Sequence, residues 1–217
     1  MAPRFEVLPD AAAVARVAAQ TVREALAGGA RTLVLAGGTT PAAAYQELAG
    51  MEVAWGRVTV LFGDERCVPP GDPASNYRMA RETLLSRVDP ASVHRMPGEL
   101  GPDEAAAQYE EVVAALEPLD VVLLGVGEDG HTASLFPGNP ALQASGLVTG
   151  VRGAPKPPPE RVSLTLRTLR AAHVVLVLAT GAGKAEAVRL ARTGTVPSGM
   201  IEQARWLLDP EAAAGGS

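Results

Sequence analysis

The chain has 217 residues, enough to bury a large hydrophobic core within one α/β domain. Its 24 acidic and 19 basic residues give a net charge of -5, which argues against a nucleic-acid partner, since such proteins need a basic surface. The single cysteine, Cys67, excludes an internal disulfide and a cysteine zinc cluster and predicts a reducing compartment. No apolar run approaches the ~18 residues of a membrane span, and residues 1–10 lack a signal-peptide pattern. We therefore expect a soluble, cytoplasmic protein.

Apolar runs of strand length alternate along the chain with longer stretches patterned as helices. In chain order we expect strand Arg4–Leu8, helix Ala11–Ala27, strand Thr32–Ala36, helix Pro41–Leu48, strand Val58–Phe62, helix Ser75–Arg87, strand Val93–Met96, helix Asp103–Leu116, strands Val121–Val126, Leu147–Val151, Arg161–Leu166 and His173–Ala179, helices Lys184–Ala191 and Ser198–Gln203, and strand Arg205–Leu208.

This order predicts a largely parallel, doubly wound α/β sheet, because strands that alternate with helices pair in parallel. The continuous apolar run 174–178 is typical of a strand covered on both faces. We expect one domain over residues 1–217, with residues 211–217 as a frayed tail. The proline cluster at 155–159 predicts a stiff surface loop, since proline cannot donate to a sheet.

The first candidate site is the turn Gly37-Gly38-Thr39-Thr40-Pro41, which follows an expected strand and opens a helix. Two glycines allow the backbone to approach a ligand, while free amides and the positive helix end attract an anion. The alternative is an ordinary capped strand-to-helix turn.

The second candidate is Asp64-Glu65-Arg66, three charged residues directly after a buried strand and at the same edge of the sheet. Arg66 has the geometry to grip a phosphate or carboxylate, and the two acids are suited to proton transfer or to orienting a ligand. The alternative is a solvated turn with an internal ion pair.

The third candidate is the loop from Gly125 to His131, which carries one imidazole and two carboxylates to the carboxyl end of a strand, where ligands bind in open sheets. Histidine titrates near neutrality and suits acid–base catalysis, with Asp129 beside it and Gly130 between them. The spacing of glycines matches a dinucleotide fingerprint, but Pro137 and Pro140 prevent the helix that it needs. A packed histidine is the alternative.

The fourth candidate joins Arg161 and Lys184, each at a strand end, which together would complete an anion pocket facing the Gly37–Pro41 turn. Gly183-Lys184 lacks the remaining residues of a nucleotide-binding P-loop. Three histidines and one cysteine make a closed metal site improbable, so we expect neither metal nor cofactor.

Taken together, the motifs resemble the 6-phosphogluconolactonase family over roughly positions 4–209. The matching residues are Gly37–Pro41, Gly63–Pro69 with Ser75-Asn76, Gly125–Gly138 around Asp129-Gly130-His131, Arg161–Thr165, Lys184-Ala185 and Trp206–Asp209. Two departures are Thr39, where the family usually has serine, and Val196-Pro197-Ser198, which replaces a common Pro-Ala pair. The resemblance implies a Rossmann-like three-layer αβα sandwich, similar to glucosamine-6-phosphate deaminase, without a nucleotide cofactor.

The resemblance further implies hydrolysis of 6-phospho-D-glucono-1,5-lactone, with this small molecule as the partner and no obligatory protein partner. His131 would activate water as a general base, without metal or covalent intermediate, and Asp129 would orient it. The phosphate would lie on Gly38, Thr39, Thr40, Arg161 and Lys184, and Gly37, Asp64, Glu65 and Gly130 would complete the pocket. Arg66 would contact either the phosphate or the oxyanion.

Two other functions compete with this one. An amino-sugar phosphate deaminase or isomerase on the same scaffold would also place Asp64, Glu65 and His131 near a phosphate. Its histidine block normally continues Ile-Ala-Phe-Asn-Glu-Pro, whereas this chain reads Thr-Ala-Ser-Leu-Phe-Pro from Thr132. A non-catalytic phosphosugar sensor would usually carry a further domain for DNA or a protein partner, for which 217 residues leave no room.

Overall fold

A computed structural model describes residues 3–215 of the chain. Its central sheet holds seven strands in the order β1-β10-β9-β6-β2-β3-β5, and every neighbouring pair is parallel. The strands are β1 (Arg4–Val7), β10 (Arg205–Leu208), β9 (Val174–Ala179), β6 (Val121–Gly125), β2 (Thr32–Leu35), β3 (Thr59–Phe62) and β5 (Ser92–Val93). This confirms the expected parallel α/β sheet.

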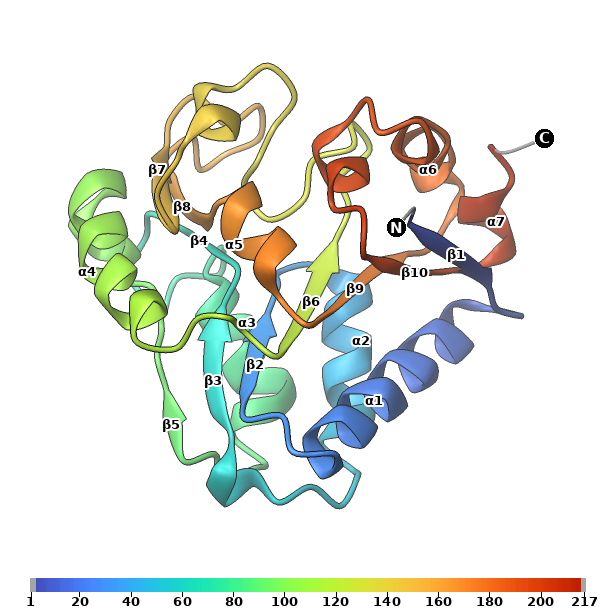
Figure 1. Ribbon diagram of the computed structural model, residues 1–217, viewed down its shortest axis with the longest axis horizontal. Coiled ribbons are helices and arrows are strands. Elements are labelled where there is room, and N and C mark those ends of the chain that lie inside the picture. Colours follow the sequence, from blue (N-terminus) through green and yellow to red (C-terminus); the bar gives the residue numbers. More distant parts are fainter. Residues whose placement is uncertain (1–2, 216–217) are drawn as a thin grey trace.

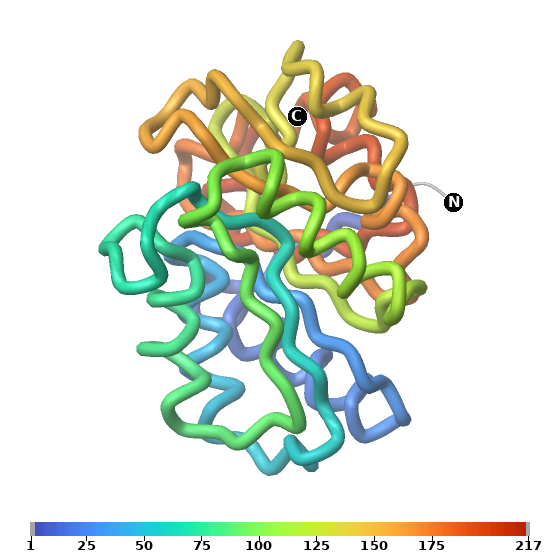
Figure 2. The backbone as a smooth tube through the Cα atoms, turned by 90° about the vertical axis from the view of Figure 1, so that its left-hand side faces the viewer, coloured from blue at the N-terminus to red at the C-terminus, as the bar shows by residue number. Residues whose placement is uncertain are grey.

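Helices flank this sheet on both sides, as the order of the sequence predicts (Figure 1). They are α1 (Ala11–Ala27), α2 (Thr39–Leu48), α3 (Asn76–Ala80), α4 (Pro102–Ala114), α5 (Leu166–Ala171), α6 (Ala185–Arg192) and α7 (Pro210–Ala213). In Figure 2, α2 and α3 lie on one side of the strands β2, β3 and β5, and α4 lies on the other. No helix among residues 3–215 is both long enough and apolar enough to cross a membrane.

The core of the sheet consists of the apolar runs that mark its central strands. All four residues of β2 are buried, and Val175 to Ala179 of β9 are at most 2% exposed. Burial of each valine or leucine side chain among them stabilises the fold by ~1.5–3 kcal/mol. Because both faces are covered, these strands show no alternation of polar and apolar residues.

A second, antiparallel sheet, which the sequence did not reveal, lies beside the first. It has the order β4-β8-β7, with β4 (Asp64–Arg66), β8 (Arg161–Leu164) and β7 (Val148–Val151). In its register Asp64 lies opposite Ser163, and Arg66 opposite Arg161. The small sheet therefore brings two arginines from distant parts of the chain together.

Several elements differ from the predicted ones for local reasons. The strand expected over Arg161–Leu166 ends at Leu164, because the Thr165 side chain accepts a hydrogen bond from the Thr168 amide and starts α5. The helix expected over Ser198–Gln203 is a short 3-10 turn, Pro197–Met200. The helix expected over Ser75–Arg87 is α3, continued by a π turn over Arg81–Leu85.

The end of the chain also differs from the frayed tail predicted for 211–217. Asp209 accepts a hydrogen bond from the Ala212 amide and caps α7, and Pro210 occupies the first turn. Ala212 is fully buried, so packing holds this short helix against the body of the protein. Residues 216 and 217 of the expected tail lie outside the described residues.

Candidate active site

A cavity of ~360 Å³ lies at the carboxyl ends of β2, β6 and β9 and against the small sheet. This edge of an open parallel sheet is where ligands bind, and the volume falls within the range of small-molecule sites. The cavity is lined by Ala36, Gly37, Gly38, Thr39, Thr40, Pro41, Asp64, Arg66, Asn76, Gly125, Val126, Gly127, His131, Ala133, Phe136, Lys156, Pro157, Arg161, Leu178 and Lys184. Residues from all four sequence motifs therefore line one cavity. The Gly37–Pro41 turn, the charged segment at Asp64 and the His131 loop each follow a different strand, and Arg161 and Lys184 both reach the cavity.

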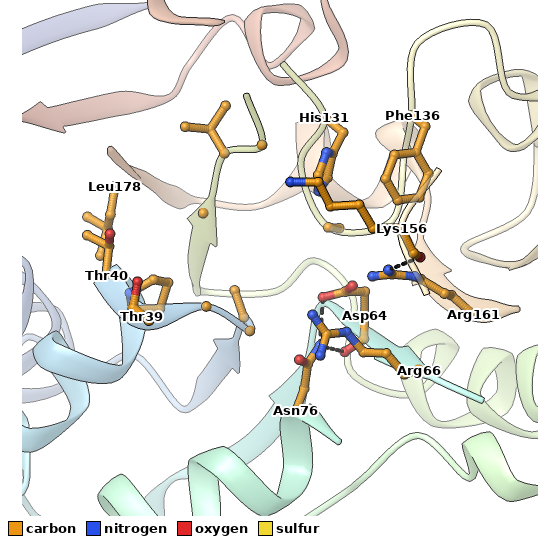
Figure 3. A pocket seen from close by; sticks show the side chains of 18 of the residues that line it. Thr39, Thr40, Asp64, Arg66, Asn76, His131, Phe136, Lys156, Arg161 and Leu178 are labelled. Atoms are coloured by element: carbon orange, nitrogen blue, oxygen red, sulfur yellow. Dashed lines mark hydrogen bonds between the residues drawn. The ribbon is translucent and has the colours of Figure 1, made fainter. Parts of the chain in front are cut away.

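The charge of the lining is strongly positive although the chain has a net charge of -5. Arg66, Lys156, Arg161 and Lys184 line the cavity, with Asp64 as the carboxylate among the lining residues. Figure 3 shows Thr39 and Thr40 on one side of the cavity and Arg66, Arg161 and Asp64 on the other. A local concentration of cations in an acidic protein indicates that the cavity takes an anion.

His131 and Asp129 form a hydrogen-bonded pair at the end of β6. The distance from His131 Nδ1 to Asp129 Oδ1 is 2.5 Å, and the His131 backbone amide donates to the same oxygen at 3.2 Å. A carboxylate accepts only, so Nδ1 carries a proton, and in the neutral imidazole Nε2 is then the nitrogen with a free lone pair. Burial raises the pKa of the Asp129 carboxyl, but the hydrogen bond and the charge of His131 outweigh it, and the pKa is lowered overall.

Two glycines of this loop, Gly127 and Gly130, are required by close contacts. A Cβ on Gly127 would collide with the His131 ring and with Asp129 Oδ1. Gly130 has a φ of 81°, a left-handed conformation that favours glycine, and its missing Cβ leaves room for Val196. The Gly130 carbonyl accepts a hydrogen bond from the Ser198 amide at 3.1 Å. The segment that departs from the family pattern therefore supports the histidine loop from behind.

Buried polar groups fix the other end of the histidine loop. Asp64 Oδ2 accepts a hydrogen bond from Ser134 Oγ at 2.7 Å, and its Oδ1 accepts one from Asn76 Nδ2 at 3.1 Å. The Ser134 amide donates to Ser163 Oγ at 3.2 Å. Ala133, the residue before Ser134, has a φ of 49°, which is rare outside glycine. Asp64 thus holds loops in place at the pocket wall.

Glu65 points away from the cavity, contrary to its expected place in the pocket. Its carboxylate accepts hydrogen bonds from the amides of Arg66, Asn76 and Tyr77 and from Ser75 Oγ. Burial raises the pKa of Glu65, and these hydrogen bonds oppose the rise. Successive side chains of a strand face opposite ways, so Asp64 and Arg66 reach the pocket while Glu65 anchors the start of α3. Gly130 also lies outside the lining and packs against Val196.

The Gly37–Pro41 turn has the backbone geometry that suits an anion. Gly38, with φ 104° and ψ 160°, precedes α2, so the free amides at the first turn of α2 lie at the cavity. A Cβ on Gly37 would collide with the side chain of Asn76, so only glycine fits there. The Thr40 hydroxyl lies 2.8 Å from that of Thr180, which joins α2 to the end of β9.

The two arginines are partly engaged by the protein itself. Arg66 Nη1 donates to the Ala74 carbonyl at 2.6 Å. Arg161 Nε and Nη2 donate to the carbonyls of Pro158 and Lys156 at 3.1 and 2.9 Å. Burial lowers the pKa of Arg161, and the charge of nearby Asp64 opposes this effect. Arg161 also lies 5.5 Å from the Phe136 ring centre, which in turn lies 4.4 Å from the centre of the His131 ring.

The lining residues that sequence reasoning did not place in the site include three with larger polar, aromatic or charged side chains: Asn76, Phe136 and Lys156. Asn76 and Phe136 lie within motifs that carry the family resemblance, so that pattern contained a signal for them. Lys156 lies in the proline cluster, and only the fold of the loop between β7 and β8 brings it to the cavity. Among residues 3–215, no group of three or more His, Cys, Asp or Glu side chains is arranged to hold a metal ion.

Comparisons with known proteins agree with this geometry. Residues 9–208 match the family described as glucosamine-6-phosphate isomerases/6-phosphogluconolactonase. The 6-phosphogluconolactonase of Mycobacterium leprae is 42% identical, with 90% of each chain covered, and that of Streptomyces coelicolor is 40% identical, with 96% of this chain and 90% of the other covered.

Solved structures extend the similarity to three dimensions. The crystal structure of 6-phosphogluconolactonase from Thermotoga maritima has a TM-score of 0.87 at 29% identity, covering 95% of this chain and 99% of that one. A monomeric glucosamine-6-phosphate deaminase has a TM-score of 0.85 at 21% identity, covering 98% of this chain and 99% of that one, and so shares the fold. The expected αβα architecture is confirmed.

Proposed function

Because this chain belongs to the family of glucosamine-6-phosphate isomerases and 6-phosphogluconolactonases, we propose that it hydrolyses 6-phospho-D-glucono-1,5-lactone to 6-phosphogluconate. One observation carries the proposal: a single cavity of ~360 Å³ holds both the His131 imidazole and the anion site at the start of α2. A hexose phosphate has a phosphate at one end and the lactone carbonyl at the other, and each end finds a matching group. Our proposal includes a cytoplasmic location, based on the single cysteine.

The phosphate binds at the first turn of α2. The amides of Thr39 and Thr40, their hydroxyls and the ammonium of Lys184 supply donors at this end of the cavity. Each charge-assisted hydrogen bond stabilises the complex by ~1.5–3 kcal/mol. Arg161 lies farther along the wall, where Nη1 remains available while Nε and Nη2 hold backbone carbonyls. Phosphate binding holds the sugar ring in position. The binding energy thus offsets the translational and rotational entropy that the substrate loses before the chemical step.

Hydrolysis begins when water attacks C1 of the lactone. His131 Nε2 takes a proton from this water, and the C1 carbonyl becomes a tetrahedral oxyanion. When the intermediate collapses, the bond from C1 to the ring oxygen breaks, and His131 returns the proton to that oxygen. The product is an open-chain carboxylic acid, which loses its proton to solvent. Asp129 keeps the proton on Nδ1 and stabilises the imidazolium.

We assign Arg66 to the oxyanion rather than to the phosphate. Arg66 lies beside Asp64 and across the cavity from Thr39 and Thr40, on the same side as Arg161 and Lys156 (Figure 3). Its Nη1 is tied to the Ala74 carbonyl, which fixes the guanidinium in place before substrate arrives. Preorganised donors of this kind stabilise a developing negative charge most effectively.

The decisive experiment compares wild type with His131→Ala in a lactone-hydrolysis assay, with the spontaneous reaction subtracted. The variant should lose nearly all catalysis yet retain its circular dichroism spectrum and its binding of 6-phosphogluconate. Lys184→Ala should instead raise KM strongly on the phosphorylated lactone. Unchanged turnover in His131→Ala, or equal activity on unphosphorylated gluconolactone, would contradict the proposal. Ammonia release from glucosamine 6-phosphate by wild type would favour the deaminase instead.

A further inference from the structure

We infer that Lys156 is a second ammonium for the substrate phosphate and that the rim carboxylate of Glu128 competes with that phosphate for it. This inference rests on the proposed function and adds a specificity-determining residue to it. Lys156 lines the cavity together with Lys184, although the two come from distant parts of the chain, one in the β7–β8 loop and the other after β9.

The position of the Lys156 backbone is fixed, whereas its side chain is free to move. Arg161 Nη2 donates to the Lys156 carbonyl, and Arg161 Nε donates to that of Pro158. The Ala154 amide closes the loop by donating to the Pro159 carbonyl at 3.0 Å. Three consecutive prolines restrict the backbone further. The Lys156 side chain itself is 68% exposed, so it can change rotamer at the mouth of the cavity while its backbone stays in place.

The ammonium of Lys156 has few competing partners. Among the described residues, its nearest carboxylate is Glu128 Oε2 at 4.0 Å, beyond hydrogen-bond distance, and no hydrogen bond is donated by Nζ. The exposed Lys156–Glu128 pair is weak, as such pairs contribute ~0–1 kcal/mol. A phosphate dianion offers Lys156 a stronger partner than Glu128 does.

Glu128 marks the place where the two lysines meet. A Cβ built on Gly183, the residue before Lys184, would lie 3.6 Å from Glu128 Oε1. The Glu128 carboxylate therefore lies between Lys156 and the turn that carries Lys184. In the absence of substrate it is the anion at this point of the rim, and a bound phosphate displaces it from Lys156.

This arrangement also gives Arg161 a clear part in phosphate binding. Two of its nitrogens support the loop of Lys156, so Arg161 acts largely through that loop. Lys156 is then the residue through which the small antiparallel sheet contacts the phosphate.

The test measures KM and kcat of Lys156→Gln on phosphorylated and unphosphorylated lactone, and the affinity for 6-phosphogluconate and inorganic phosphate by calorimetry. We expect KM on the phosphorylated lactone to rise about tenfold with kcat retained, and no change in KM on gluconolactone. Glu128→Gln should do the reverse and tighten 6-phosphogluconate binding about threefold. Arg152→Gln, which changes the charge of the same loop outside the cavity, is the matched control and should match wild type.

Three results would overturn the inference while leaving the proposed function intact. The first is a Lys156→Gln variant whose KM, kcat and ligand affinities all equal those of wild type. The second is a fall in kcat of Lys156→Gln on both lactones at constant KM, which would place Lys156 at the reacting carbon. The third is an equal loss of affinity in Lys156→Gln and Arg152→Gln, which would indicate a general charge effect. A wild-type protein that neither hydrolyses the lactone nor binds 6-phosphogluconate would instead refute the proposed function itself.

Discussion

Replacing Asp129 by asparagine tests how much of the catalytic rate depends on the carboxylate behind His131. The Nδ1–Oδ1 distance of 2.5 Å is that of a strong, charge-assisted hydrogen bond. Such a bond contributes ~1.5–3 kcal/mol, and each 1.36 kcal/mol changes a rate tenfold. In the proposed mechanism the imidazolium forms only during the reaction, so this stabilisation applies to the transition state. We therefore expect kcat to fall about 10- to 150-fold.

The same substitution should leave KM nearly unchanged, since Asp129 does not line the cavity. The asparagine amide can also donate to Nδ1 and so leave the proton on Nε2, which removes the base and adds to the loss. Proton release from the opening lactone, followed with a pH indicator, gives both constants. Asp103→Asn, an exposed carboxylate paired with Arg152, serves as the matched control. An unchanged kcat in Asp129→Asn would refute our account of the pair.

Three further predictions concern the supports of the site. Gly127→Ala should reduce kcat at least as much as Asp129→Asn, because its Cβ collides with the His131 ring; turnover equal to wild type would show that the loop adapts freely. Ser134→Ala should lower the free energy of unfolding by ~1–3 kcal/mol in urea titrations, since Asp64 Oδ2 loses its buried donor; an unchanged midpoint would argue against that network. Cys67 should react slowly with iodoacetamide at pH 8, because burial, and then the charges of Glu160 and Glu65, raise its pKa to about 11; the thiolate then forms only as the pH approaches 11, and a native rate equal to that in urea would contradict this.

The parallel sheet could be predicted well because a strand that is buried on both faces appears in the sequence as a continuous apolar run. Residues 174–178 are continuously apolar, and β9 occupies almost the same residues. The bounds of α1 match the predicted helix, and in the structure Asp10 caps its start by accepting a hydrogen bond from the Ala13 amide. The positions of His131, the Gly38 turn and Lys184 then follow from the rule that ligands bind at the carboxyl ends of parallel strands.

The small antiparallel sheet could not be predicted in the same way. Its strand β4 has three residues, Asp64 to Arg66, all charged, and offers no apolar pattern. Without that strand, the alternation that turns Glu65 away from the pocket was invisible. Lys156 was missed for a related reason, because a proline cluster predicts a loop but not which cavity that loop overhangs. Contacts between distant loops depend on tertiary structure and not on local pattern.

The division of labour between the two sheets has a consequence for redesign. The proposed acid–base pair follows a strand of the parallel sheet, whereas Lys156 and its supporting guanidinium belong to a hairpin whose connection spans residues 152–160. A hairpin connection tolerates changes in length without shifting the strands of a neighbouring sheet. Grafting other connections onto β7 and β8 is therefore a direct route to variants that open lactones bearing different acidic groups while the hydrolytic machinery stays intact.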